Sequence, residues 1–231
     1  MSEWYTKIGF DGDPFSKDSG FEGHDALVEE VFYAIQSGNM VSIVGDSGSG
    51  KTKILREIIK RFGGKKKIIY VNCKHMQKLV NVETLLQNRQ GFFKRIMGKK
   101  PNKMILLLDE VESLTSKNCE RIKYYFDQNY LQSVIFTGKS FPVEGMSQSL
   151  VQRISKVLKI DPLSDYEAVR IIRDKIGDKY LTDRVIKTIY SKSGRNTGKL
   201  LQNCKTVMTE IAHGKKDITD EEVEKLLSFE K

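Results

Sequence analysis

The segment GDSGSGKT, residues 45–52, restricts the fold of this chain more than any other part of the sequence. It fits the pattern G-x-x-x-x-G-K-[ST], whose glycines let backbone N–H groups surround the phosphates of a nucleotide. The apolar segment MVSIV comes directly before it, and KILREIIKRF, which has a helical pattern, comes directly after it. A strand, a glycine loop and a helix in this order are the context that a phosphate-binding loop requires. We therefore expect an α/β fold whose loop holds a nucleotide.

The residues of this loop have separate expected roles. Lys51 is predicted to contact the terminal phosphates, and the Thr52 hydroxyl is predicted to bind Mg²⁺. The helix that begins at Lys51 adds the positive end of its dipole. The predicted nucleotide-binding residues of the loop are Gly45, Asp46, Ser47, Gly48, Ser49, Gly50, Lys51 and Thr52.

A second apolar segment, MILLLDE at residues 104–110, ends in two acidic residues. A parallel strand that is buried on both faces stays apolar up to its carboxyl end, where ligands bind in open α/β sheets. Asp109 is predicted to hold Mg²⁺, directly or through water, and Glu110 to polarise the attacking water. A chain that only held a nucleotide would have little use for Glu110. The pair therefore favours ATP hydrolysis over binding alone.

Apolar segments that alternate with helical patterns predict a parallel sheet covered by helices on both faces. The expected strands are residues 40–44, 67–72, 104–110, 133–138 and 156–160. The expected helices of this region are residues 24–37, 51–62 and 119–129, with a mostly helical stretch that ends near residue 97. Gly, Asp and Ser interspersed with aromatic residues predict an irregular arm over the first ~22 residues.

The pattern changes after residue 162, where no further strand is indicated. Ser164 and Glu167 fit the S-x-x-E capping box that begins a helix. We expect two domains, a nucleotide-binding core with its arm at residues 1–162 and a lid of four helices at residues 163–231.

The phosphate loop, the acid pair, a polar residue at the end of the fourth strand and the helical tail together resemble an AAA+ ATPase, over about residues 10–225. Within that superfamily, DPFS…FEGHDALVEEV and IDPLSDYEAVRII are similar to segments of replication initiators, transposition ATPases and helicase loaders. The resemblance implies a five-stranded sheet in the order 5-1-4-3-2. It also implies an adenine pocket between core and lid, and a homo-oligomeric ring or filament.

The resemblance also assigns further catalytic positions. Thr137 in VIFTGKS fits the residue that senses the γ-phosphate, with Ser140 as the alternative. Arg153, just before the fifth strand, fits the arginine finger; the alternative is a surface arginine paired with a nearby acid.

The expected lid residues depart from the family pattern. The family's G-N-P-R-x-L compares with RNTGKLL, which puts Gly198 at the arginine. Lys199, one residue later, is the residue we assign to the nucleotide, and Arg195 upstream is the alternative. His24 stands where the family has an arginine beside the adenine, and a structural role is expected for it.

The formal net charge of +9 and the pI near 9.3 favour an anionic partner, and DNA is the expected one. Basic residues cluster in GGKKKI, residues 63–68, and in NRQGFFKRIMGKKPNK, residues 88–103. We expect Phe92 and Phe93 to lie on the buried side of a helix and some lysines to contact the DNA backbone. Related initiators often carry a winged-helix DNA reader after the lid, for which no residues remain before Lys231. We therefore expect the chain to contact the DNA backbone itself, or to assemble on a protein partner that is already on DNA.

The cysteines favour a reducing compartment. The three cysteines are far apart and form no CxxC pair, so a disulfide framework or a zinc site is not expected. No apolar run approaches the ~20 residues that span a bilayer, and the N-terminus lacks the pattern of a secretion signal. A cytoplasmic protein without a membrane segment is predicted.

These observations predict a Mg²⁺-dependent ATPase that acts on DNA, as an assembly or loading factor in replication, transposition or recombination. One alternative is the archaeal STAND-type NTPase switch, because the TGSS-like strand end of that group resembles FTGKS. The other is an ATP-dependent oligomeric scaffold with little turnover. Glu110 argues against the scaffold, and the glycine at position 198 argues for it.

Overall fold

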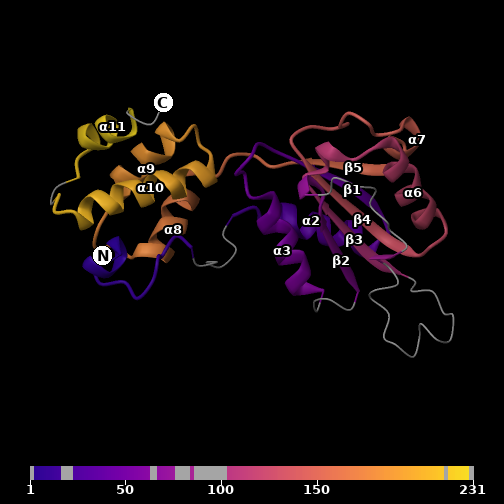
Figure 1. Cartoon of the computed structure of the whole chain (residues 1–231), viewed down its shortest axis with the longest axis horizontal. Helices are drawn as coiled ribbons and strands as arrows, with labels where there is room; N and C mark the ends of the chain where they lie inside the picture. The colour runs from indigo at the N-terminus through magenta and orange to yellow at the C-terminus, as the bar shows by residue number, and fades with distance from the viewer. Residues whose placement is uncertain are drawn as a thin grey trace. The chain divides into compact units, whose positions relative to one another are not determined.

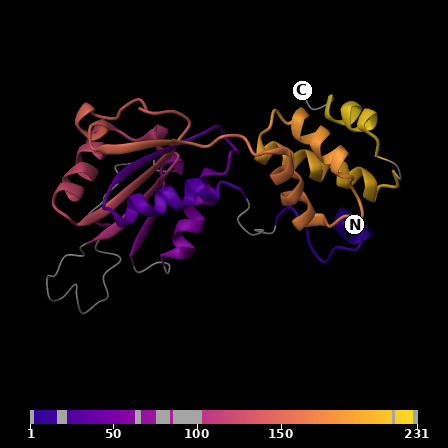
Figure 2. The same ribbon diagram turned by 180° about the vertical axis from the view of Figure 1, so that it is seen from behind.

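The computed structural model forms two compact units. The sheet unit comprises Asp25–Asp46 and Gly50–Ile160, and the helical unit comprises Met1–His24, Ser47–Ser49 and Asp161–Lys231. Figures 1 and 2 show both units from opposite sides. The structure describes residues 3–16, 23–62, 67–75, 84–85, 103–215 and 218–228.

The sheet unit contains a parallel sheet of five strands in the order β2-β3-β4-β1-β5. This is the predicted order read from its other edge. The strands are β1 (Met40–Val44), β2 (Ile68–Asn72), β3 (Met104–Asp109), β4 (Leu131–Gly138) and β5 (Ile154–Lys159).

The apolar or charged character of each strand agrees with its position in the sheet. Strand β3 is buried along its whole length, which explains its unbroken apolar run. Strand β5 lies at an edge and exposes most of its residues, among them Lys156 and Lys159. Charged residues at such an edge discourage pairing with another chain.

The described residues of the sheet unit also form helices and two 3₁₀ turns. They are α2 (Asp25–Gln36), α3 (Lys51–Arg61), η1 (Cys73–His75), η2 (Val111–Ser113), α6 (Ser116–Asp127) and α7 (Gln148–Val151). Helix α2 packs against β1 and β4, α3 against β3 and β4, and α6 against β4. The predicted helical stretch up to residue 97 lies mostly outside the described residues.

The helical unit contains the predicted four C-terminal helices. They are α8 (Asp165–Ile176), α9 (Asp183–Lys192), α10 (Thr197–Ala212) and α11 (Asp220–Ser228). The predicted capping box at the start of α8 is confirmed, since Ser164 and Glu167 exchange side-chain and backbone hydrogen bonds. Apolar residues of all four helices form one core, which includes Ile172, Ile189, Val207 and Val223.

The N-terminal arm packs on the helical unit. Its short helix α1 (Trp4–Lys7) contacts α10, and its apolar residues join the helical core. The sequence-based grouping of the arm with residues 1–162 therefore differs from the structure, in which the units divide between Ile160 and Asp161. The physical reason is that the arm's aromatic side chains find an apolar surface on α8 and α10.

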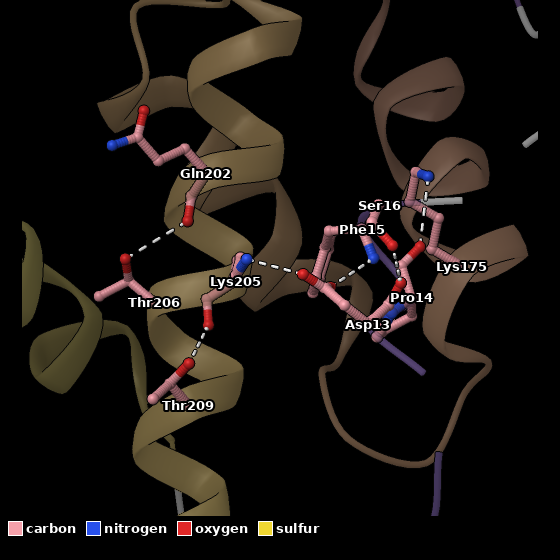
Figure 3. A network of polar contacts seen from close by, with 9 residues as sticks. All are labelled: Asp13, Pro14, Phe15, Ser16, Lys175, Gln202, Lys205, Thr206 and Thr209. Carbon is pink, nitrogen blue, oxygen red and sulfur yellow. Dashed lines mark hydrogen bonds and ion pairs between the residues drawn. The ribbon is translucent and has the colours of Figure 1, made fainter. Parts of the chain in front are cut away.

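Polar contacts hold the same arm (Figure 3). The Asp13 carboxylate accepts from Lys205 Nζ of α10 at 2.7 Å and from the Phe15 backbone N–H at 2.9 Å. Lys175 Nζ of α8 donates to the Pro14 carbonyl at 3.4 Å. Burial alone would raise the pKa of Asp13, but the hydrogen bonds from Lys205 and Phe15 together outweigh it and lower that pKa.

Cys73, Cys119 and Cys204 are free and buried, and their thiols belong to the two apolar cores. Burial raises the pKa of Cys73 to about 12 and also raises the pKa of Cys119 and Cys204. Within the described ranges, no helix combines the length and the apolar character needed to cross a bilayer.

Candidate functional site

The register of the sheet brings Gly45, Asp109 and Thr137 to one edge. Asn72 pairs with Asp109 across β2 and β3, and Val44 pairs with Gly138 across β1 and β4. The Gly45 N–H, just beyond β1, donates to the Gly138 carbonyl at 3.1 Å. The phosphate loop therefore begins beside the ends of β3 and β4, where α/β sheets bind ligands.

Asp109 is the centre of the polar contacts at this edge. Its side chain is fully buried, with 0% of the residue exposed. Oδ2 accepts from the Thr52 hydroxyl at 2.8 Å, and Oδ1 accepts from the buried Thr137 hydroxyl. The predicted metal residues Thr52 and Asp109 and the predicted sensor Thr137 thus form one connected group. Ser140, the alternative sensor, is exposed beyond the strand.

Lys51 lies within the loop. Its Nζ donates to the carbonyl of Gly45 at 2.5 Å and to that of Asp46 at 2.7 Å. Partial burial lowers the pKa of Lys51, although four acids, Glu112 first among them, act in the opposite direction. A phosphate placed there would replace carbonyl oxygens with a full negative charge, which a partly buried ammonium binds more strongly.

The loop backbone fits a bound phosphate. Gly48 and Gly50 have φ angles of +80° and +104°, in the region that side chains rarely adopt. Gly50 is the N-cap of α3, without a side-chain capping hydrogen bond, and the first turn of α3 has no acid. The N–H groups at this helix start are therefore available to an anion.

Glu110 occupies a strained position directly after β3. Its φ and ψ are 53° and 57°, the left-handed region, which costs a residue with a side chain roughly 1–2 kcal/mol. Its Oε2 is buried and has no hydrogen-bond partner among the described residues. Strain and an unpaired buried oxygen in one residue are typical of a functional position that awaits a ligand or water.

The oxygens of Thr52 and Asp109 suit Mg²⁺. Hydroxyl and carboxylate oxygens are hard ligands, and Mg²⁺ in nucleotide enzymes takes few protein ligands together with phosphates and water. Consistently, the part of the chain that the structure describes contains no group of three or more His, Cys, Asp or Glu residues that could hold a metal alone. The residues present fit a metal bound with a nucleotide.

Two residues near this edge were missed by sequence reasoning. Tyr70 of β2 donates its hydroxyl proton to Asp109 Oδ2 at 3.0 Å, and Glu112 accepts from the Lys139 backbone N–H at 2.6 Å. Burial and the adjacent Asp109 charge raise the pKa of Tyr70 to about 12. The available signal was the alternation in IIYVN, which puts Tyr70 and Asn72 on the same face of a strand that ends at the ligand edge.

Arg153 is not part of this group. It precedes β5, whose first residue Ile154 pairs with Met40 at the start of β1. Arg153 therefore lies where the strands begin, opposite to the carboxyl ends where the phosphate loop lies. Its side chain is 52% exposed, and its Nε lies 3.4 Å from Asp127 Oδ1. Arg153 cannot reach the phosphate loop that follows β1 of its own sheet unit. The five residues of β1, a length of about 16 Å, lie between them.

The predicted lid residues lie in the helical unit. Arg195 donates to the Leu163 carbonyl at 3.2 Å and pairs with Asp165 at 3.0 Å, so its charge is engaged there. Lys199 is exposed in the first turn of α10, one residue after Gly198.

The structure does not place several other predicted residues in the group at the sheet edge. Ser47, Gly48 and Ser49 are grouped with the helical unit. His24 has a left-handed φ of 60° beside the buried Gly23. Both basic clusters, with Phe92 and Phe93, lie outside the described residues except for Lys67, Ile68 and Lys103.

A family model described as "AAA domain" matches residues 37–169, which is more than half of the chain. The chain belongs to this AAA family. Nucleotide binding is the common property of AAA domains, in agreement with the loop described above. A comparison with curated proteins found no match.

Solved AAA structures share the fold. The RuvB Holliday junction branch migration motor of Thermotoga maritima has 17% sequence identity and a TM-score of 0.71, covering 94% of this chain and 73% of that one. The ORC1 protein of Aeropyrum pernix, solved in complex with DNA, has 16% identity and a TM-score of 0.69, covering 94% and 68%. The ORC2 protein of the same organism has 15% identity and a TM-score of 0.62, covering 94% and 71%.

Proposed function

We propose that this AAA protein hydrolyses ATP with Mg²⁺ and uses the reaction on DNA. One observation supports the catalytic part: Asp109 accepts from the hydroxyls of Thr52 and Thr137, and Glu110 has a buried carboxylate oxygen with no hydrogen-bond partner in the described part of the chain. A site that only retained a nucleotide would have no use for that oxygen.

Each residue has a distinct task in the proposed reaction. Lys51 exchanges its loop carbonyls for phosphate oxygens and neutralises their charge. Glu110 accepts a hydrogen bond from the attacking water and polarises it, and its fixed backbone holds the carboxylate in place. Thr137 donates its hydroxyl proton to Asp109 in this structure, and in the proposed reaction that donor would turn to the terminal phosphate. When bound, Mg²⁺ would neutralise charge that develops on the phosphate oxygens.

Charge and fold support DNA as the polymer. The chain carries a formal net charge of +9, and lysines suit contact with phosphates better than base reading. Two proteins of similar fold are described as a Holliday junction motor and as a DNA complex. We propose backbone contact, a homo-oligomer with Arg153 at its subunit boundary, and a contribution of Lys199 to nucleotide binding.

Lys51→Ala and Glu110→Gln test the proposal as a pair. Lys51→Ala should abolish ATP binding, whereas Glu110→Gln should bind ATP as the wild type does and lose turnover by about 10²-fold or more. Fluorescent-nucleotide titration and phosphate release give the two readouts. Equal loss of binding in both variants would remove Glu110 from its assigned task.

The same phosphate-release assay with and without DNA, over a salt series, tests the polymer. We expect DNA to raise turnover and added salt to weaken DNA binding steeply. Turnover that DNA does not change would favour a switch with another target. Wild-type ATP binding with negligible turnover would favour a scaffold.

A further inference from the structure

Tyr70 contacts Asp109 but has no task in the proposed reaction. Strand β2 is the edge strand beside β3, and Tyr70 lies two residues before its end. The residue is 36% exposed, yet its hydroxyl points inward and donates to Asp109 Oδ2 at 3.0 Å. A tyrosine with this exposure could hydrogen-bond water instead. The inward direction of the hydroxyl therefore points to a role at Asp109.

A neighbouring amide fixes this hydroxyl. Asn72 Oδ1 accepts the Lys74 backbone N–H at 3.0 Å, which orients the amide. The Asn72 side chain in turn hydrogen-bonds Tyr70. Because Tyr70 donates its one proton to Asp109, its oxygen acts as the acceptor toward Asn72, and the Asn72 NH₂ group is the donor.

The hydroxyl contacts determine what Asp109 can do. Oδ2 accepts from both Thr52 and Tyr70, while Oδ1 accepts from Thr137. The carboxylate is thereby held from three sides, by β2, β4 and the start of α3. Groups that hydrogen-bond a metal-binding carboxylate orient it, and their loss typically weakens metal affinity 10–100-fold.

We propose that Tyr70 is a positioning residue that fixes Asp109 for Mg²⁺, and that Asn72 orients Tyr70. This inference rests on the proposed Mg²⁺-dependent function. It adds a task for the edge strand: β2 supplies no group to the phosphates in this assignment but sets how strongly the metal is held.

Tyr70→Phe tests the inference, because it removes only the hydroxyl. The measurement is ATP affinity by fluorescent-nucleotide titration over a Mg²⁺ series, with Glu110→Gln in every chain to prevent turnover. Tyr70→Phe should leave metal-free nucleotide affinity unchanged and raise the half-saturating Mg²⁺ concentration about tenfold or more. Tyr33→Phe, on the 71% exposed Tyr33, is the matched control and should titrate as the parent.

Asn72→Ala provides a second test that retains the Tyr70 hydroxyl. It should raise the half-saturating Mg²⁺ concentration less than Tyr70→Phe does, with unfolding temperatures measured for every variant. A parent chain whose ATP binding ignores Mg²⁺ would overturn the proposed function. If the parent chain responds clearly to Mg²⁺ and a folded Tyr70→Phe chain responds in the same way, the role of Tyr70 is overturned. A folded Asn72→Ala chain with the parent's response would overturn the role of Asn72 alone.

Discussion

At the scale of single residues, the candidate site depends on groups that are costly to the folded chain. Glu110 has a left-handed backbone and a buried oxygen without a partner in the described part of the chain. Neither feature improves folding. In the proposed reaction both features would hold the carboxylate beside the attacking water, which would be an exchange of stability for activity.

Glu110→Gly should therefore stabilise the chain while it removes turnover. Glycine relieves roughly 1–2 kcal/mol of backbone strain, and deletion of the unpaired oxygen contributes about 1–3 kcal/mol. The greater freedom of glycine in the unfolded chain offsets about 0.5–1 kcal/mol. We expect a net gain of about 1 kcal/mol or more, measured by urea unfolding followed by circular dichroism. Glu110→Gln, which keeps the strain, should gain less, and a glycine variant less stable than the parent would contradict this account.

Sequence motifs predicted the residues that meet at the sheet edge but not how they are held. Lys51, Thr52 and Asp109 follow from spacing, because a loop and a strand end with those residue types have few other uses. The contact of Tyr70 depends on the register between β2 and β3, which the residues of one strand do not encode alone. The left-handed backbone of Glu110 could not be predicted, since Glu has no preference for it.

At the scale of elements, predictions were most accurate where local chemistry decides. The predicted start of α8 is confirmed, because the side chains of Ser164 and Glu167 each accept from the other residue's backbone N–H group. Strand β1 agrees with its predicted bounds. Short elements were missed: α1 and α7 have four residues each, too few for a helical period to be recognised.

Ser164→Ala should destabilise the helical unit by about 1 kcal/mol at neutral pH. The hydrogen bonds from Ser164 lower the pKa of Glu167, so the charged carboxylate contributes stability above its usual pKa and loses it as the pH falls through the lowered value. The difference between parent and variant should therefore shrink below about pH 4. Thermal unfolding at pH 7 and pH 3 measures it, with the exposed Ser191→Ala as the control; an equal difference at both values would refute the carboxylate's part.

At the scale of the whole molecule, chain order misled the grouping of the arm. Sequence reasoning assigned the arm to the segment that follows it, because no local signal states which surface Trp4, Phe10 and Phe15 will cover. The structure shows that they join the core of the helical unit. Packing of this kind depends on the surface of the C-terminal helices, which cannot be read from the sequence of the arm.

Arg153 should act between subunits. Arg153→Ala should bind ATP normally and lose turnover on the order of 10³-fold, with little change in unfolding temperature, because a surface pair such as Arg153–Asp127 is worth about 0–1 kcal/mol. Turnover should recover in part when Arg153→Ala is mixed with Glu110→Gln, since one shared site then has both residues. Arg184→Ala, 86% exposed, is the control. Constant specific activity on dilution to monomers would contradict a shared site.

The arm also determines when the helical unit can be completed. Residues 3–16 of the arm are separated in sequence from residues 161–215 and 218–228 of this unit by the strands β1–β5. On the ribosome, the arm therefore emerges first and cannot bury its aromatic residues until α8 and α10 have been synthesised, whereas β1–β5 are complete by residue 159. Trp4, the single tryptophan of the chain, contacts that late core. Its fluorescence should therefore report the packing of the arm on the helical unit, a step that can take place only after β1–β5 have been synthesised.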